Sequence, residues 1–224
     1  MITRRLFLMC VISSIIISCT SSNGVTDVSI GDGNPIEDND DEVSDADYDL
    51  LFIGNSLTYS NDLPGLVKEE AEKRGIAINT KMLAKSNYAI IDHWNEGGVQ
   101  DLIKSKKYDF VIIQQGPSSQ SEGRDMLFYD GQKYSALCNE NDVKLVYFMV
   151  WPARAYYHTF SAVIANYRDA AIFNNALLSP VGSVWKQHFD DTGDFSYYTT
   201  DQFHPSHLGS QVAAEVIVQS MNLQ

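Results

Sequence analysis

The chain has 224 residues, a length that suits one domain. Its formal net charge of −13 excludes the basic footprint of a nucleic-acid-binding protein. Hydrophobic residues make up 44% of it, which is enough for a sizeable core. The acidity is concentrated at the start, because residues 1–47 hold nine of the 29 acidic residues and only two of the 16 basic ones. The charge therefore indicates nothing about a substrate, and no nucleic acid is expected among the partners.

Residues 1–19 have the pattern of a bacterial lipoprotein signal peptide. Two arginines precede an apolar stretch, Leu6–Ile17, that is too short for a comfortable membrane span. Ser18-Cys19 then completes a sequence similar to a lipobox, in which the Cys is acylated and becomes N-terminal after cleavage. We expect lipidation of Cys19 and a location in the bacterial cell envelope, outside the cytoplasm, with membrane contact through the lipid anchor only. A plain signal peptide with an incidental Cys is the alternative.

Residues 20–47 consist mainly of Ser, Asn, Gly, Asp and Glu. Such a segment buries too little apolar surface to offset the entropy of ordering it, so we predict a disordered acidic linker. The remaining residues, 48–224, are predicted to form one domain. Its single cysteine, Cys138, is expected to be a small buried residue rather than a nucleophile.

The predicted domain alternates strands with helices. Apolar runs typical of buried strands, and one alternating strand, are expected at residues 50–53, 76–83, 110–113 and 144–150, with a short edge strand at 181–184. Helices are expected at residues 64–74, 90–104 (with a break at Gly97-Gly98), 128–139, 159–178 and 206–221. This alternation predicts an α/β fold in which helices cover both faces of a parallel sheet. Ligands of such sheets bind beyond the carboxyl ends of the strands.

The first candidate site segment, Gly54-Asn55-Ser56, directly follows the first predicted strand. A serine at a strand-to-helix turn exposes its hydroxyl at the rim of the sheet, beside backbone N–H groups that can bind an oxyanion. A Gly-Asn-Ser turn is common by itself. Its position after a buried strand is therefore what makes it informative.

The second candidate segment, Thr200–Ser206, contains Asp201 and His204 and directly precedes the last predicted helix. An Asp and a His three residues apart can face the same way, so that the carboxylate fixes the imidazole tautomer and the imidazole acts as a base. An exposed loop with an incidental Asp and His is the plainer interpretation. A metal site is a third, but the sequence offers no further ligands for it.

Together the two segments resemble those of the SGNH (GDSL-like) hydrolases, and the resemblance covers residues 48–222. It implies a flavodoxin-like three-layer α/β/α sandwich with a central parallel sheet. It also implies a serine esterase in which Ser56 is the nucleophile, His204 the general base and acid, and Asp201 the residue that orients His204. No cofactor and no metal are expected.

The two middle motifs of that family are altered in this chain. Asn87 stands where glycine is usual after the second strand; Asn tolerates left-handed backbone geometry, and its N–H can still donate. After the third strand, Gln114-Gln115-Gly116-Pro117-Ser118 replaces the usual G-x-N-D, and it looks like a variant of carbohydrate-acetylesterase-like branches. The resemblance implies an oxyanion hole of Ser56, Asn87 and Gln115, with Gln114 as the second choice for the glutamine and Ser118 as the third.

Four residues are expected to contact the substrate: Gln114, Ser118, Trp151 and Tyr156. The two aromatic rings can stack on a sugar, although aromatic residues pack in cores more often. The expected reaction is hydrolysis of acyl esters, chiefly acetyl esters, of a small molecule or glycan. The alternatives are a lipase or thioesterase with the same machinery, and a non-catalytic glycan-binding surface lipoprotein on a decayed hydrolase scaffold. The sequence leaves the oligomeric state open.

Overall fold

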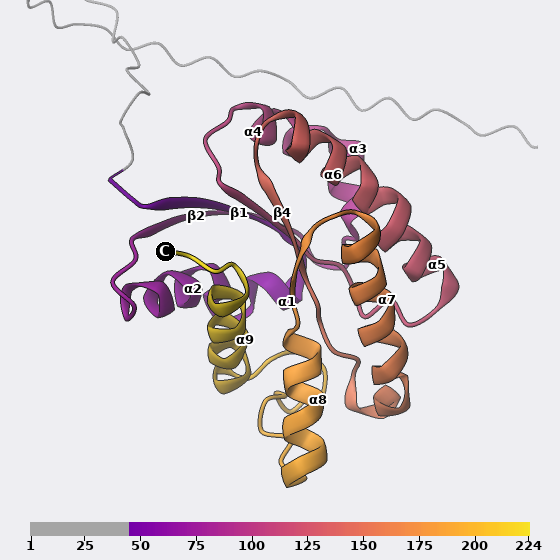
Figure 1. The fold of residues 1–224 in the computed structure, drawn as a ribbon. Helices are drawn as coiled ribbons and strands as arrows, with labels where there is room; N and C mark the ends of the chain where they lie inside the picture. The colour runs from indigo at the N-terminus through magenta and orange to yellow at the C-terminus, as the bar shows by residue number, and fades with distance from the viewer. Residues whose placement is uncertain (1–44) are drawn as a thin grey trace, which may run out of the picture. The chain divides into compact units, whose positions relative to one another are not determined.

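A computed structural model describes residues 45–224 of the chain (Figure 1). The predicted signal peptide, the lipobox residue Cys19 and linker residues 20–44 lie outside the described residues. The last linker residue already belongs to the domain, since Asp47 N–H donates to Ala77 O (2.9 Å) and the Asp47 carboxylate accepts from Ala77 N–H (2.8 Å). The domain therefore begins slightly before the predicted boundary at residue 48.

The centre of the fold is a five-stranded, wholly parallel sheet with the strand order β2-β1-β3-β4-β5. Its strands are β1 (Tyr48–Gly54), β2 (Ile78–Ala84), β3 (Phe110–Ile113), β4 (Lys144–Phe148) and β5 (Leu177–Ser179). The apolar runs Leu50–Ile53 and Phe110–Ile113 are almost fully buried, as expected for central strands that are covered on both faces.

Helices flank the sheet in two layers (Figure 1). They are α1 (Ser56–Tyr59), α2 (Leu63–Glu72), α3 (Ile90–Glu96), α4 (Gly98–Lys104), α5 (Ser121–Asp125), α6 (Gly131–Glu140), α7 (Phe160–Phe173), α8 (Val181–Thr192) and α9 (His207–Ser220). Helices α2 and α9 pack against each other in one layer, and α3, α4, α6 and α7 form the other. The predicted three-layer α/β/α sandwich with a parallel sheet is thereby confirmed. No helix of residues 45–224 is both long and apolar enough to cross a membrane.

The predicted helix at 159–178 is too long. Helix α7 ends at Phe173, and Asn175 follows with a φ of 48°, a left-handed conformation that Asn tolerates and that ends a helix. The next residues, Leu177–Ser179, leave the helix and pair with β4 as the edge strand β5. The edge strand was therefore predicted a few residues too late in the chain.

Residues 181–184 are helical rather than extended. They begin α8, whose buried residues Val181, Trp185 and Phe189 recur every four positions. That spacing is a helical period, but it extends beyond the four residues on which the strand was predicted. The predicted helix at 128–139 begins too late, because the helical segment starts at Ser121 and continues through a single π-helical turn, Met126–Asp130, into α6.

Candidate active site

Ser56 lies at the carboxyl end of β1, at the first position of α1. Asn55 caps this helix, because its Oδ1 accepts from Leu57 N–H (3.1 Å). The strand can turn this tightly because residue 54 is a glycine: a Cβ atom there would overlap Thr58 Oγ1 and lie 2.6 Å from Gln114 Oε1. The local sequence thus places the Ser56 hydroxyl at the rim of the sheet.

His204 connects Ser56 with Asp201. Its Nε2 lies 2.9 Å from Ser56 Oγ, and its Nδ1 lies 2.6 Å from Asp201 Oδ2. The carboxylate can only accept, so Nδ1–H donates to it and Nε2 is left to accept the serine proton. The structure therefore brings the three expected residues together in the order nucleophile, base and orienting carboxylate.

The carboxylate of Asp201 accepts four hydrogen bonds of 2.6–2.9 Å. They come from His204 Nδ1, Thr199 Oγ1, and the N–H groups of Phe203 and His204. Burial raises the pKa of this carboxyl, but the hydrogen bonds, led by the one from His204, together hold the pKa well below its ordinary value. Asp201 is therefore charged at neutral pH and can stabilise a protonated His204.

Contacts from other elements hold the Asp201–His204 loop against the Ser56 turn. Asn61, five residues after the serine, donates to Pro205 O and Ser210 Oγ, both at 2.9 Å. His93 is buried, and its Nε2–H donates to Gly54 O (2.8 Å) beneath the turn. The Asn61 bonds fix the relative position of two segments that are far apart in the sequence, and the His93 bond supports the turn.

Trp151 lines neither the cavity at Ser56 nor the groove beside it, although the sequence predicts it as a substrate-binding residue. The side chain is fully buried and stacks on Trp185 of α8, with ring centroids 3.5 Å apart. Its Nε1–H donates to Phe203 O (3.0 Å), inside the loop that carries Asp201 and His204. Trp151 therefore supports the loop from below. The sequence could not indicate this because the helix containing Trp185 was not recognised.

Gln114 is buried and lines neither the cavity at Ser56 nor the groove beside it. It is 1% exposed, and its Oε1 accepts from Asn55 N–H (3.0 Å) and Thr58 Oγ1 (2.8 Å). Its Nε2 donates to Gln115 O. Gln114 thus ties the turn after β1 to the turn after β3, and the expectation that it contacts the substrate is not met.

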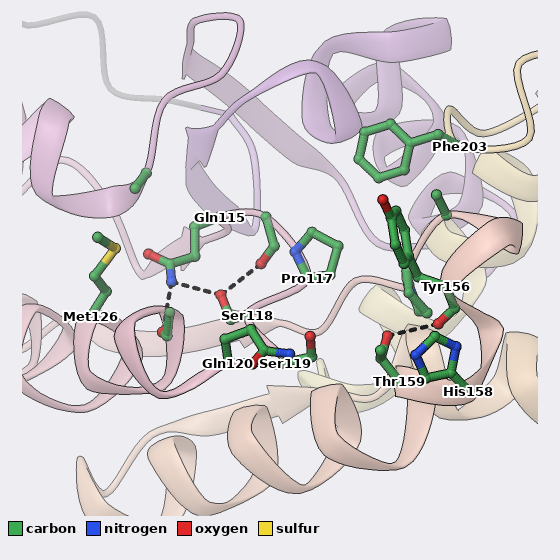
Figure 2. A pocket seen from close by; sticks show the side chains of 15 residues that line it. Gln115, Pro117, Ser118, Ser119, Gln120, Met126, Tyr156, His158, Thr159 and Phe203 are labelled. Atoms are coloured by element: carbon green, nitrogen blue, oxygen red, sulfur yellow. Dashed lines mark hydrogen bonds between the residues drawn. The ribbon is translucent and has the colours of Figure 1, made fainter.

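Gln115 has no free amide hydrogen to offer an oxyanion (Figure 2). Its Nε2 donates to Ser118 Oγ (2.8 Å) and to Gly123 O (3.1 Å), which engages both hydrogens within the loop after β3. Its Oε1 is buried and has no partner within residues 45–224. Gln115 therefore shapes the loop after β3, and in this arrangement its amide is not free to act as the expected oxyanion donor.

A small cavity of about 230 Å³ lies directly at Ser56, and it is lined also by Asn87, Gly116 and Phe203. Asn87 has a φ of 63° and is the third residue of a turn closed by Tyr88 N–H to Lys85 O (3.2 Å). Positive φ at this position of a turn favours Gly or Asn, so Asn replaces the usual glycine at little cost. Asn87 is thus placed beside Ser56, as expected.

A larger groove of about 820 Å³ adjoins this cavity, and the two share Ala89, Gly116 and Phe203 in their walls. Figure 2 shows Phe203 and Tyr156 on one side of the groove, with Gln115, Ser118 and Met126 on the other. Tyr156 is 62% exposed, and both it and Ser118 lie at the groove as expected.

Several groove residues were missed from the sequence: Met126, Pro152, Thr159 and Phe203. They come from the π-helical turn, from the loop after β4 and from the loop that carries His204. Of these four, Phe203 had a signal, since it lies next to His204 in the second motif. Within residues 45–224, no group of three or more His, Cys, Asp or Glu side chains is arranged to hold a metal ion.

No model of a known protein family matches the chain, and no curated protein matches it. Solved structures do match. One is assigned to the SGNH hydrolases, from Slackia heliotrinireducens, with 21% identity, a TM-score of 0.66, and coverage of 78% of this chain and 99% of that one. Another is an acetyl-xylooligosaccharide esterase, Axe2, from Geobacillus stearothermophilus, with 16% identity, a TM-score of 0.59, and coverage of 80% and 96%. A third is a lipase/acylhydrolase from Enterococcus faecalis, with 15% identity, a TM-score of 0.61, and coverage of 78% and 95%. The described domain therefore has the fold of the SGNH hydrolases.

Proposed function

We propose that this chain is a serine esterase that hydrolyses acyl esters through an acyl-enzyme on Ser56. The observation that carries the proposal is the continuous line of hydrogen bonds from Ser56 Oγ through His204 to Asp201. A serine hydroxyl is a weak nucleophile unless an adjacent base removes its proton. This arrangement supplies that base together with the carboxylate that orients it.

The reaction follows from the geometry in two acyl-transfer steps. Ser56 Oγ attacks the ester carbonyl carbon while His204 Nε2 takes the hydroxyl proton, and the carbonyl oxygen becomes an oxyanion. When the carbonyl reforms, the alcohol leaves with the proton from His204. Water then attacks the acyl-enzyme by the same sequence, giving back its proton through His204 and releasing the acid and free Ser56.

The substrate we favour is an acetyl ester on a carbohydrate. The cavity at Ser56 is small, about 230 Å³, which suits a short acyl group beside the nucleophile. The adjoining groove, with Tyr156 exposed at its side, offers room and an aromatic surface for the alcohol part of the ester. One protein of similar structure is named as an acetyl-xylooligosaccharide esterase.

A lipase or thioesterase is the second candidate, and one observation favours it. The groove of about 820 Å³ contains apolar side chains, including Met126, Phe203 and two prolines, which could equally hold a long acyl chain.

A non-catalytic glycan-binding protein is disfavoured, because binding alone does not require Ser56, His204 and Asp201 to be held in hydrogen-bonding order.

Hydrolysis of p-nitrophenyl esters of increasing acyl length, beside the Ser56→Ala variant, tests the proposal. We expect Ser56→Ala to lower kcat by at least about 10³-fold, because it removes the nucleophile. A kcat/KM that falls with acyl length supports an acetylesterase, and one that rises with length supports a lipase or thioesterase. Turnover of the best substrate that is equal in the wild type and Ser56→Ala contradicts a serine esterase.

We also propose that the protein is anchored to the bacterial cell envelope through a lipid on Cys19. The support is the lipobox-like sequence that ends at Cys19. Incorporation of labelled palmitate in a bacterial host is expected for the wild-type chain and not for Cys19→Ala. Equal labelling of both chains would refute this anchor.

A further inference from the structure

Neither glutamine of the loop after β3 offers its side-chain amide to an oxyanion at Ser56. Gln114 is buried, and its Nε2 donates to Gln115 O. Gln115 uses both amide hydrogens within its own loop. A third donor from this loop must therefore come from its main chain.

Three main-chain N–H groups remain. Those of Ser56, Asn87 and Gly116 donate to no acceptor within the part of the chain that the structure describes, and all three residues line the same cavity of about 230 Å³. The N–H of Ser56 is free because it is the first of helix α1 and has no partner within that helix. Free backbone donors gathered beside a nucleophile are the structural requirement for an oxyanion hole.

The direction of the Gly116 N–H follows from its peptide group. Gln115 O accepts from Tyr167 OH (2.8 Å) and from Gln114 Nε2, and both of these side chains are buried. In a trans peptide, the C=O and the following N–H point in opposite directions, and no cis peptide occurs among the described residues. The Gly116 N–H therefore points away from the buried side, towards the cavity that Gly116 lines.

We propose that the Gly116 main-chain N–H is the third donor of the oxyanion hole, alongside those of Ser56 and Asn87, in place of the Gln115 side-chain amide. This inference rests on the proposed esterase function. As the bond from Ser56 Oγ to the carbonyl carbon forms, the π pair moves to the carbonyl oxygen, which accepts from the three N–H groups. The pair returns when the bond to the leaving alcohol breaks.

Gln114 and Tyr167 act in this site as positioning residues. The Gln114 carboxamide accepts from Asn55 N–H on the Ser56 turn and donates to Gln115 O, the carbonyl that precedes Gly116. The Tyr167 hydroxyl lies within hydrogen-bonding distance of Gln115 O (2.8 Å) and Gly116 O (3.1 Å). These contacts fix the Gly116 peptide before the substrate binds, so that little reorganisation is needed in the transition state.

The test compares Gly116→Pro, which has no N–H, with Gly116→Ala, which keeps it. A Cβ atom at position 116 would meet no atom within 4 Å, so the alanine variant is a matched control. In the full-length protein, with the best p-nitrophenyl ester, we expect Gly116→Pro to lower kcat by about 10²–10³-fold with little change in KM. Gly116→Ala keeps the N–H, and its kcat is expected to exceed that of Gly116→Pro by at least about ten-fold.

A Gly116→Pro variant that is as active as Gly116→Ala overturns the inference. Ser56→Ala is measured in parallel, because its retained activity would instead refute the esterase function itself. If thermal melting shows that Gly116→Pro is unfolded, the Tyr167→Phe variant tests the inference instead. This variant keeps the ring and removes only the hydroxyl beside Gln115 O and Gly116 O. A kcat that falls several-fold at unchanged KM supports the inference, and an unchanged kcat overturns it.

Discussion

At the scale of single residues, the chemistry depends on which ring nitrogen of His204 carries the proton. Asp201 decides this, because its carboxylate accepts from Nδ1 and leaves Nε2 facing Ser56 Oγ. The same carboxylate is held by backbone N–H groups and by Thr199, so it cannot turn away from the ring. One carboxylate therefore sets both the tautomer and the orientation of the base.

Asp201→Asn is expected to lower kcat by as much as about 10⁴-fold, because an amide hydrogen facing Nδ1 moves the ring proton to Nε2. Steady-state hydrolysis of the best p-nitrophenyl ester measures the effect. Asp191→Asn is the control, since Asp191 only accepts from Gln187 on the exposed side of α8. Comparable kcat values for the two variants would mean that Asp201 does not orient the base.

At the scale of elements, the loop from Thr199 to His204 depends on the charge of Asp201. The folded pKa of this carboxyl lies below the unfolded value of about 3.9, so the stability it contributes is present above that pH. It is lost as the pH falls through the lower, folded pKa. Acid should therefore weaken this loop by protonating Asp201.

Melting curves of the wild type and Asp201→Asn between pH 7 and pH 2.5 test this expectation. The wild type should melt at the higher temperature near pH 7. The difference should narrow below about pH 4, where protons bind this carboxyl in the unfolded chain more readily than in the folded one. A difference that stays constant over the whole range would show that the Asp201 charge does not stabilise the fold.

The turn between β1 and α1 has a strict steric requirement at Gly54. Gly54→Ala is expected to destabilise the protein by about 1–3 kcal/mol, because the new methyl group overlaps the Thr58 and Gln114 side chains. It should also lower kcat by displacing Ser56. Gly98→Ala is the control, since a Cβ atom at the start of α4 meets nothing within 4 Å. Urea unfolding measures both variants, and equal stabilities would show that the turn adapts.

At the scale of the whole domain, one hydrophobic core extends from Leu50 to Met221 and covers both faces of the sheet. Cys138 lies inside it, fully buried on α6. Burial raises the pKa of the Cys138 thiol to about 12. The thiol is therefore neither ionised nor accessible at neutral pH, which agrees with its expected role as a packing residue.

Thiol titration tests whether this core stays closed. In a chain with Cys10→Ser and Cys19→Ser, Cys138 is the single thiol, and we expect almost no reaction with Ellman's reagent at pH 8. One equivalent should react after unfolding in urea. Full reaction of the folded protein would mean that the core around α6 opens readily.

The layered α/β architecture could be predicted from the sequence alone, and so could the three residues that the structure brings together at Ser56. Apolar runs such as Phe110–Ile113 lie in buried strands because burial on both faces leaves a continuous pattern in the sequence. The Ser56 and Asp201–His204 segments could be found because together they resemble the first and last motifs of the SGNH hydrolases.

The positions of the other polar and aromatic side chains around the site depend on tertiary contacts. Gln114, Gln115 and Trp151 all looked available to a substrate, but their partners lie on other segments and keep them occupied or buried. Conversely, the Gly116 N–H has no side chain to mark it in the sequence. Hydrogen bonds and burial form between residues distant in the chain, so local composition and periodicity carry no record of them.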